Sequence, residues 1–328
     1  MKNLDNQIIV SIKCLVYNHA PYIRQCLDGF VMQKTNFRFE AIVHDDASTD
    51  GTQDIIREYA EKYPDIIKPI YETENQYSKK DGSLRKIMNN ACNGKYIALC
   101  EGDDYWIDPL KLQKQVDILE KHSDYTIIFN KVQAIDKEGN ILNWTIPYMN
   151  DIQEGPITLE DYSKEEFFNG HWTFHTSSVM YRASIMEEYM RSGLYKFFPY
   201  GDMPLMLYFL YTGFGYYFSD ISGSYRWLSG GYNSTIRGNK EKAIKDNQQL
   251  IKGLKFFDIY TRKKYSKYIK RRIYKAEYDN FKLKSNYIAI YSPKYRHFRN
   301  KMDYFNLKTQ IAETFIPHVY KLYKKFFH

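Results

Sequence analysis

Short apolar runs alternate with segments of helical spacing along the N-terminal part of the chain. Runs at 8–17, 39–44, 66–71 and 95–100 have the length and composition of buried strands. Between these runs, and again at 109–121, apolar residues recur three and four positions apart, as they do on one face of a helix. Strands that alternate with helices favour a mostly parallel sheet covered by helices. The sequence therefore predicts an α/β fold.

Carboxylates follow directly after the fourth apolar run, at Glu101, Asp103 and Asp104. The carboxyl ends of parallel strands are where open α/β sheets bind ligands. Adjacent carboxylates repel each other and lose hydration there, so a cation normally offsets their charge, and a hard divalent metal that carries a phosphate is the usual one. The alternative is an acidic turn that starts the next helix, with Asp108 as its N-cap and Pro109 at its first position. Both interpretations explain these residues.

A second acidic loop, 45–51, follows another apolar run and reads Asp-Asp-Ala-Ser-Thr-Asp-Gly. It matches the first half of an EF-hand calcium loop, but Arg57 stands where that loop requires a bidentate glutamate, which disfavours calcium. A carboxylate here can instead accept hydrogen bonds from a nucleobase or a ribose, while Ser48 or Thr49 caps the following helix. The chain contains no glycine-rich phosphate loop, so a bound nucleotide would need a metal and side chains to neutralise its diphosphate.

Charge is divided unevenly along the chain. Residues 240–328 contain 23 lysines and arginines and 7 acids, a net of +16, whereas residues 1–239 contain 24 and 32, a net of −8. The four cysteines lack metal-ligand spacing, no apolar run reaches the roughly 18 residues of a membrane span, and no signal peptide opens the sequence. We therefore expect a cytoplasmic protein with an acidic body and a basic tail that have separate roles.

Six segments of the chain, taken in order, resemble motifs of the family 2 glycosyltransferases. They are the strand 10–18, the loop 42–52, Arg85 ahead of 94–96, the acidic run 101–104, the strand 175–182 and the pair 201–202. The resemblance covers about residues 8–235 and implies a GT-A fold, a single nucleotide-binding domain with a mixed, mostly parallel sheet. The departures are Ala47 for a glycine, Glu101 for the first aspartate, Gly201 for a glutamate, and the lack of a glycine after Asn75.

By this resemblance, one group of residues holds the nucleotide-sugar donor, for which UDP is the expected nucleotide. Tyr17 would stack on the base with the backbone of Leu15 nearby, and Asp46 would accept a hydrogen bond from the uracil ring. Arg85 would approach the base or the diphosphate.

The same resemblance assigns the chemistry to carboxylates. Asp103 would hold the ribose or a metal-bound water, and Asp104 would ligate Mn²⁺ or Mg²⁺. Asp202 would be the catalytic base of a single displacement that inverts the anomeric centre. The alternative is an inactive GT-A scaffold, which the intact Asp46, Asp103, Asp104 and Asp202 disfavour.

Three further residues have two interpretations each. Trp172 and His175 line the sugar or acceptor pocket, or they are a core aromatic and a buried histidine with satisfied hydrogen bonds. Arg226 precedes a glycine-rich loop at 229–234 that we expect to be mobile. It either clamps the diphosphate when that loop closes or forms a surface salt bridge.

The resemblance implies a glycosyltransferase domain at 1–238, and the charge division predicts a basic, aromatic-rich helical region at 239–328. An apolar stripe at 311–326 beside lysines suits an anionic membrane surface, and packing on the catalytic domain or homodimer contact are the alternatives. Nucleic acid is disfavoured because the acidic motifs would repel its phosphates. Membrane contact would suit a glycan or polyprenyl-linked glycan acceptor, and the resemblance implies bacterial polysaccharide synthesis at the inner face of the cell membrane.

Overall fold

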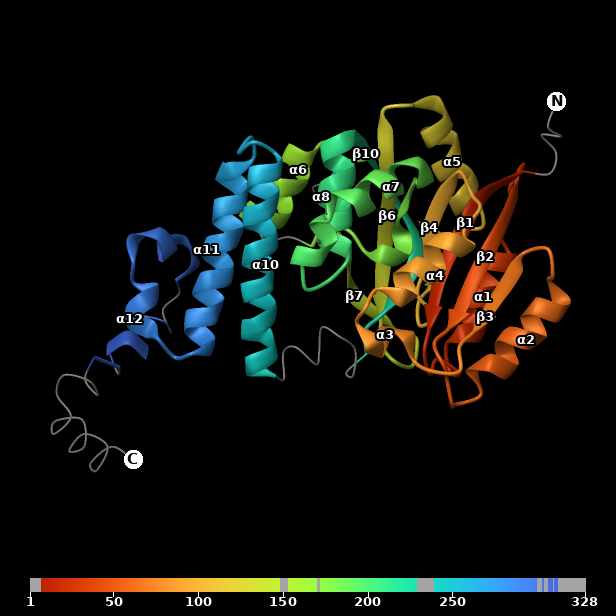
Figure 1. Ribbon diagram of the computed structural model, residues 1–328, viewed down its shortest axis with the longest axis horizontal. Coiled ribbons are helices and arrows are strands. Elements are labelled where there is room, and N and C mark those ends of the chain that lie inside the picture. Colours follow the sequence, from red (N-terminus) through yellow and green to blue (C-terminus); the bar gives the residue numbers. More distant parts are fainter. Residues whose placement is uncertain are drawn as a thin grey trace. The chain divides into compact units, whose positions relative to one another are not determined.

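The computed structural model describes residues 7–147, 153–169, 172–228, 239–299, 303, 306–308, 310 and 311 (Figure 1). The chain divides into two compact units: the first unit is Met1–Gly193 with Asp202–Ser229, and the second unit is Leu194–Gly201 with Gly230–His328. The glycine-rich loop at 229–234 and most of the stripe at 311–326 lie outside the described residues. Within the described part of the chain, no helix is long and apolar enough to cross a bilayer.

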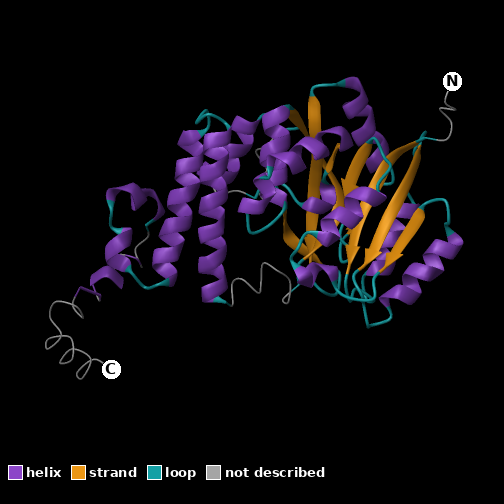
Figure 2. Ribbon diagram, viewed as in Figure 1, coloured by secondary structure: helices purple, strands orange, loops and turns teal. Residues whose placement is uncertain are grey.

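Four parallel strands form one half of the sheet in the first unit. They are β1 (Ile8–Val16), β2 (Arg38–Asp45), β3 (Ile67–Tyr71) and β4 (Tyr96–Leu99), in the spatial order β3-β2-β1-β4. Between them in sequence stand α1 (Ile23–Val31), α2 (Thr52–Lys62), α3 (Gln76–Lys79) and α4 (Ser83–Ala91). Because the strands run in one direction, their carboxyl ends share one edge of the sheet (Figure 2).

The other half of the sheet is mixed. β9 (Met180–Arg182) runs antiparallel to β4 and to β6 (Tyr125–Ile135), and β10 (Phe214–Arg226) runs parallel to β6. Short strands complete the sheet, namely β5 (Tyr105–Trp106), β7 (Ile141–Ile146) and β8 (Gly155–Ile157). The helical segments are α5 (Lys111–Lys121), α6 (Leu159–Ser163), η2 (Lys164–Asn169), η3 (Thr176–Ser178), α7 (Ala183–Ser192) and α8 (Asp202–Thr212). The α/β fold with a mixed sheet is confirmed.

Alternation along β1 decides which of its side chains enter the core. Val10, Ile12 and Cys14 are fully buried and pack with apolar residues of α1 and α5. On the opposite face, Lys13 Nζ donates to Asn89 Oδ1 of α4 at 2.5 Å. Helices therefore cover both faces of β1, and only Leu15, near its carboxyl end, is left exposed among these alternating positions.

Apolar patterns also predict strands at 175–182, 215–219 and 221–227, and all three differ in form from the structure. The segment 175–182 begins as the 3₁₀ turn η3, because Ser178 Oγ donates to His175 O at 2.8 Å and closes a turn there. Only the last three residues of that segment form β9. The two strands predicted at 215–219 and 221–227 are one strand, β10, whose register to β6 shifts after Phe218.

Two helix starts also differ from the prediction. Asp50, not Ser48 or Thr49, accepts the hydrogen bond from Thr52 N at the start of α2, at 3.1 Å. Helix α5 begins at Lys111 rather than at Pro109. Asp108 instead accepts from Leu110 N at 2.9 Å in the turn before the helix.

The second unit is helical, as the basic region was predicted to be. It contains η4 (Leu194–Phe197), α10 (Lys240–Tyr260), α11 (Ser266–Leu283), α12 (Tyr287–Ile290) and η5 (Pro293–Phe298). Phe197 stacks on Phe256 of α10 with ring centroids 4.3 Å apart. Tyr278, Ile290 and Tyr295 form a separate buried cluster.

Gly94, just before β4, lies against the backbone of β1. A Cβ at this position would meet Ser11 N at 2.3 Å and Val10 C at 2.7 Å. We expect Gly94→Ala to lower the free energy of unfolding by about 1–3 kcal/mol, because the two backbones cannot separate without disturbing their pairing. Chemical denaturation measures this loss. Gly201→Ala is the control, since a Cβ there meets no atom within 4 Å, and an equal loss in both variants would contradict the explanation.

Candidate functional site

Backbone hydrogen bonds tie together the loops that follow β1, β2 and β4. Asp46 N donates to Val16 O at 2.9 Å. Gly102 N, in the acidic loop Glu101–Asp104, donates to Leu15 O at 3.0 Å. The structure therefore brings the predicted base-binding residues and the acidic loop to one edge of the sheet.

Asp104 is the most enclosed carboxylate of the acidic loop, at 2% exposure. Its Oδ1 accepts from Arg226 N at 2.9 Å, and its Oδ2 lies 3.5 Å from His175 Nδ1. Burial, together with the charges of Asp103 and Glu101, raises the pKa of Asp104 well above its usual range. Burial and the Asp103 charge also raise the pKa of Glu101 to about 7. The loop thus holds more negative charge than its surroundings stabilise.

The acidic loop fits a divalent cation by its charge and its ligand type. Carboxylate oxygens are the ligands that Mg²⁺ and Mn²⁺ prefer, and a cation would stabilise the ionised forms that burial disfavours. In the part of the chain that the structure describes, no group of three or more His, Cys, Asp or Glu residues is already arranged to hold a metal ion. The residues therefore fit a metal held partly by protein and partly by a bound phosphate, as Mg²⁺ commonly is.

Arg226 is 3% exposed, and its hydrogen bonds hold the acidic loop in place. Its Nε donates to Asp103 O at 3.1 Å, and its Nη2 donates to Gln25 Oε1 at 2.7 Å. Its Nη1 donates to the carbonyls of Asp136 and Lys137, at 3.2 and 3.0 Å. The surface salt bridge is therefore wrong, because the side chain is buried and bonded to neutral oxygens. The diphosphate clamp stays a prediction, and the geometry gives Arg226 a positioning role.

Trp172 and His175 belong to one aromatic cluster around Tyr225. The His175 ring lies 4.0 Å from the Tyr225 ring, and the Trp172 ring lies 5.7 Å from it. Burial lowers the pKa of His175 to about 3, so the imidazole is neutral near pH 7. Trp144 and Trp227 also contact Tyr225, and the sequence analysis singled out neither of them as site residues. The cluster could not be predicted because it depends on which strands pair.

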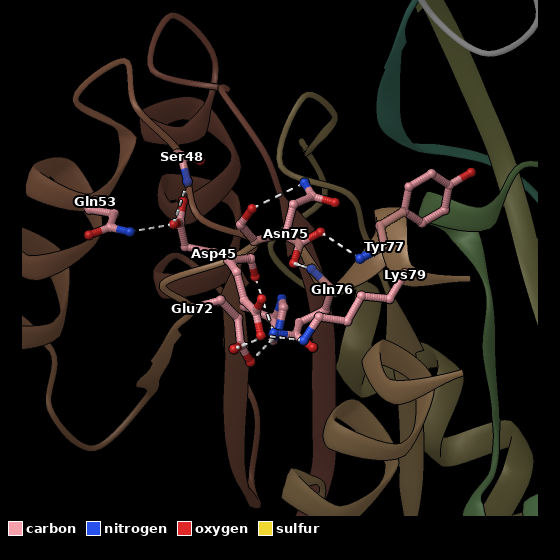
Figure 3. Close-up of polar contacts among 11 residues, drawn as sticks. Asp45, Ser48, Gln53, Glu72, Asn75, Gln76, Tyr77 and Lys79 are labelled. Atoms are coloured by element: carbon pink, nitrogen blue, oxygen red, sulfur yellow. Dashed lines mark hydrogen bonds and ion pairs between the residues drawn. The ribbon is translucent and has the colours of Figure 1, made fainter. Parts of the chain in front are cut away.

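The carboxylate of Asp46 already holds two backbone groups. Oδ1 accepts from Gln76 N at 2.6 Å, and Oδ2 accepts from Tyr77 N at 3.0 Å. Asn75 Nδ2 donates to Asp46 O at 3.2 Å (Figure 3). Glu72 bonds both His44 and the side chain of Gln76, at 3.1 and 3.0 Å. The short helix α3 is thereby docked on the end of β2, a contact that the sequence analysis missed.

The other residues that the resemblance assigns to the nucleotide-sugar donor are Leu15 in β1, Tyr17 just after it and Arg85 in α4. Tyr17 is 48% exposed just after the strand, and Leu15 is 37% exposed two residues before it. Arg85, in α4, is near enough to Lys13 for its charge to lower the pKa of Lys13, which burial already lowers. Arg85 therefore lies on the face of β1 that carries Leu15, as its predicted role requires.

Asp202 is the first residue of α8, and its helix is buried along most of its length. Its Oδ1 accepts from Met203 N at 2.7 Å. Burial raises the pKa of Asp202 above that of an ordinary aspartate, and its charge raises the pKa of Glu101. Asp202 is therefore close enough to the acidic loop to interact with it electrostatically.

His19 is a site residue that sequence reasoning missed. A Cβ on Gly102 would lie 2.9 Å from His19 Nδ1, so the ring lies against the acidic loop. Burial lowers the pKa of His19, while the charges of Asp103, Asp50 and Asp45 raise it. The only signal in the sequence is its position two residues after Tyr17.

The model of the family described as "Glycosyl transferase family 2" matches residues 11–190 of the chain, which is more than half of it. An uncharacterized protein of Mycobacterium tuberculosis is 46% identical over 130 residues, which are 40% of this chain and 37% of that protein. An uncharacterized glycosyltransferase of Nostoc is 30% identical over 181 residues, which are 55% of this chain and 52% of the relative. The matches thus span about half the length of these relatives or less.

Two solved structures share the fold at 16% identity each. Residues 1–349 of TarS from S. aureus, in complex with UDP-GlcNAc, give a TM-score of 0.54 over 84% of this chain and 81% of that one. A mannosyltransferase from Pyrobaculum calidifontis, in complex with GDP-Man and Mn²⁺, gives 0.57 over 97% of this chain and 84% of that one. The arrangement of the sheet is therefore one that is found in glycosyltransferases.

Replacement of Arg226 by alanine tests its positioning role. Arg226→Ala would leave main-chain oxygens of the acidic loop and of residues 136–137 without donors, so we expect it to lower the free energy of unfolding by about 3 kcal/mol or more. Denaturant titration measures this change. Arg24→Ala is the control: its ion pair with Glu58 is about half exposed on both sides, so little loss is expected. Equal losses in the two variants would remove the case for Arg226 as a buried support.

Proposed function

The chain belongs to glycosyl transferase family 2, and from this premise we propose that it moves a sugar from a UDP-sugar to a hydroxyl of a glycan or lipid-linked glycan acceptor. The observation that carries the proposal is that Asp46 and the acidic loop lie together at the carboxyl edge of one sheet, with Asp202 near enough for its charge to raise the pKa of Glu101. This is where α/β sheets bind nucleotides. We assign this activity to residues 1–238.

Leu15, Tyr17, Asp46 and Arg85 are proposed to hold the nucleotide. An exposed tyrosine beside a buried carboxylate suits a base, whose faces stack and whose edge donates hydrogen bonds. UDP is the favoured nucleotide because TarS, which shares this fold, is found in complex with UDP-GlcNAc. The mannosyltransferase in complex with GDP-Man keeps a guanine nucleotide as the alternative that the donor assay tests.

The acidic loop is proposed to bind the donor diphosphate through a metal. A bound Mn²⁺ or Mg²⁺, held by Asp104 with Asp103 beside it, would offset the charge that the leaving diphosphate gains. Arg226 holds this pair in place: its Nε donates to Asp103 O and its backbone N donates to the Asp104 carboxylate. The neutral His175 beside Asp104 adds no competing positive charge.

Asp202 is proposed to be the catalytic base. Its carboxylate takes the proton of the acceptor hydroxyl while the hydroxyl oxygen attacks the anomeric carbon. The bond between that carbon and the diphosphate oxygen breaks in the same step, and the configuration inverts. The raised pKa of Asp202 makes it a stronger base than an ordinary aspartate. Trp172 and the aromatic cluster around Tyr225 would offer apolar faces to sugar rings.

The second unit is proposed to contact an anionic membrane surface, which would suit a polyprenyl-linked acceptor in polysaccharide synthesis. Five cations in the turn after α10 and the first residues of α11 are exposed and, within the described residues, form no ion pair; they are Arg262, Lys263, Lys264, Lys267 and Lys270. We call these five residues the basic corner. Each cation near an anionic surface contributes about 1 kcal/mol to binding.

Release of UDP from a panel of UDP-sugars, with GDP-mannose included, tests the catalytic proposal. We expect slow hydrolysis of one donor that requires Mn²⁺ or Mg²⁺, stops with EDTA, and falls at least about 100-fold in Asp202→Asn. Since Asp202 acts deprotonated and its pKa is raised, the rate should fall at acidic pH above the usual aspartate range. Donor binding in Asp202→Asn should persist.

Three outcomes would count against the proposal. Full activity in Asp202→Asn would remove this residue as the base. Turnover that is unaffected by EDTA would remove the metal. A folded wild-type protein that binds no nucleotide would favour the inactive scaffold instead.

Sedimentation with vesicles tests the membrane proposal. We expect binding to vesicles that contain phosphatidylglycerol, none to pure phosphatidylcholine, and weakening as salt rises. Replacement of the four lysines of the basic corner by glutamine should reduce binding more than 100-fold. Lys62 and Lys86 of the first unit, changed in the same way, are the control. Unchanged binding in the corner variant would rule out this surface.

A further inference from the structure

An exposed aromatic ring projects from the short helix α3, which is docked at the carboxyl edge of the sheet. Tyr77, in α3, is 65% exposed, which is more than Tyr17 at 48%. Within the described residues, its ring packs against no other ring and its hydroxyl has no hydrogen-bond partner. In Figure 3 the ring extends away from the cluster of polar contacts that surrounds Asp45 and Glu72. The side chain of Tyr77 therefore contributes nothing evident to the fold.

The backbone that carries this ring is held at several points. Tyr77 N and Gln76 N both donate to the Asp46 carboxylate, and Asn75 caps α3 by accepting from Ser78 N at 2.8 Å. Gln76 Nε2 donates to Glu72 Oε2 at 3.0 Å. A free aromatic ring on a fixed backbone loses little conformational entropy when a ligand binds, because only its two side-chain torsions remain to be ordered.

We propose that Tyr77 is a second stacking surface for the nucleobase of the donor, on the face of the base opposite Tyr17. This inference rests on the proposed function, and it adds a specificity residue to the nucleotide site. It also gives a role to the segment after Asn75, where the chain departs from the motif of its family by lacking a glycine.

Hydrogen-bond geometry brings the ring within reach of the base. A carboxylate oxygen has two acceptor positions, so Asp46 can bind a base N–H while it holds Gln76 N and Tyr77 N. Tyr77 N is 3.0 Å from Oδ2, and a base donor would lie about 3 Å from the same carboxylate. The base would then lie within about 6 Å of the Tyr77 backbone, a distance that a tyrosine side chain spans.

The edge and the faces of the base are then recognised by different groups. Hydrogen bonds to Asp46 lie in the plane of the base, so both faces stay available for stacking. Tyr17 follows β1, and Tyr77 stands on α3, which is docked on the residue that follows β2. Asp46 is bonded to both of these segments, through Val16 O and Tyr77 N, so the backbones that carry the two tyrosines both lie next to it. Both rings are exposed, so a planar ligand bound to Asp46 leaves each of its faces open to one of them.

Binding of UDP, UMP and inorganic pyrophosphate to Tyr77→Ala and Tyr77→Phe tests the proposal. A base stacked on an aromatic ring contributes about 1–3 kcal/mol, so we expect Tyr77→Ala to weaken UDP and UMP by a similar factor, between about 5- and 100-fold. Tyr77→Phe keeps the ring and should bind within about twofold of wild type. Pyrophosphate with Mn²⁺ lacks a base and should bind all variants alike.

Phe214→Ala is the matched control, since Phe214 is an exposed aromatic residue, at 42%, where β10 begins at the other edge of the sheet. Its nucleotide affinity should equal that of wild type. Unchanged UDP and UMP affinity in Tyr77→Ala would overturn the proposal, as would an equal loss in Tyr77→Phe. A loss for UDP and pyrophosphate without a loss for UMP would assign the ring to the diphosphate instead. A wild-type protein that binds none of the three probes would refute the proposed function itself, which distinguishes the two failures.

Discussion

Negative charge is buried in the acidic loop that follows β4, and hydrogen bonds from distant parts of the first unit are needed to hold it. Asp104 and Glu101 have raised pKa values because burial and mutual repulsion disfavour their ionised forms. The protein holds them with hydrogen bonds from a strand that is more than a hundred residues away in sequence, through Arg226 N, and from Thr176 Oγ1. Burial of these carboxylates lowers folding stability, and it leaves negative charge that a bound cation would neutralise. Such an arrangement is typical of functional sites.

Local patterns were sufficient to predict the first half of the sheet and the acidic loops. Each parallel strand there is a short apolar run, and its loop begins where the apolar run ends. The second half failed where pairing between distant segments decides the structure. The short strand β9 and the continuous strand β10 depend on pairing with β4 and β6, which no local pattern encodes. The predicted roles of the site residues, Asp202 above all, stay predictions.

Buried polar residues were the hardest part of the site to predict. Lysine is expected in solvent, yet Lys111 is fully buried, with Nζ 2.9 Å from Gln115 Oε1 and over the ring of Trp106. Burial lowers its pKa to about 7. Arg226 similarly reads as a surface residue in the sequence. The position of Lys111 is explained by the packing of Trp106, which donates to Ser177 O at 2.7 Å, and that of Arg226 by its bonds to the acidic loop and to residues 136–137.

The docking of α3 has a consequence for how such a chain can diverge. Its anchors, Asp46, Glu72 and Asn75, are separate from the positions of the helix that face solvent at 77–79. Substitutions at those exposed positions leave the sheet and its core untouched, so they carry little penalty in folding. Selection could therefore alter what this helix presents while the scaffold stays constant. Substitutions at these exposed positions can therefore change which ligand a related chain prefers without a change in its sheet.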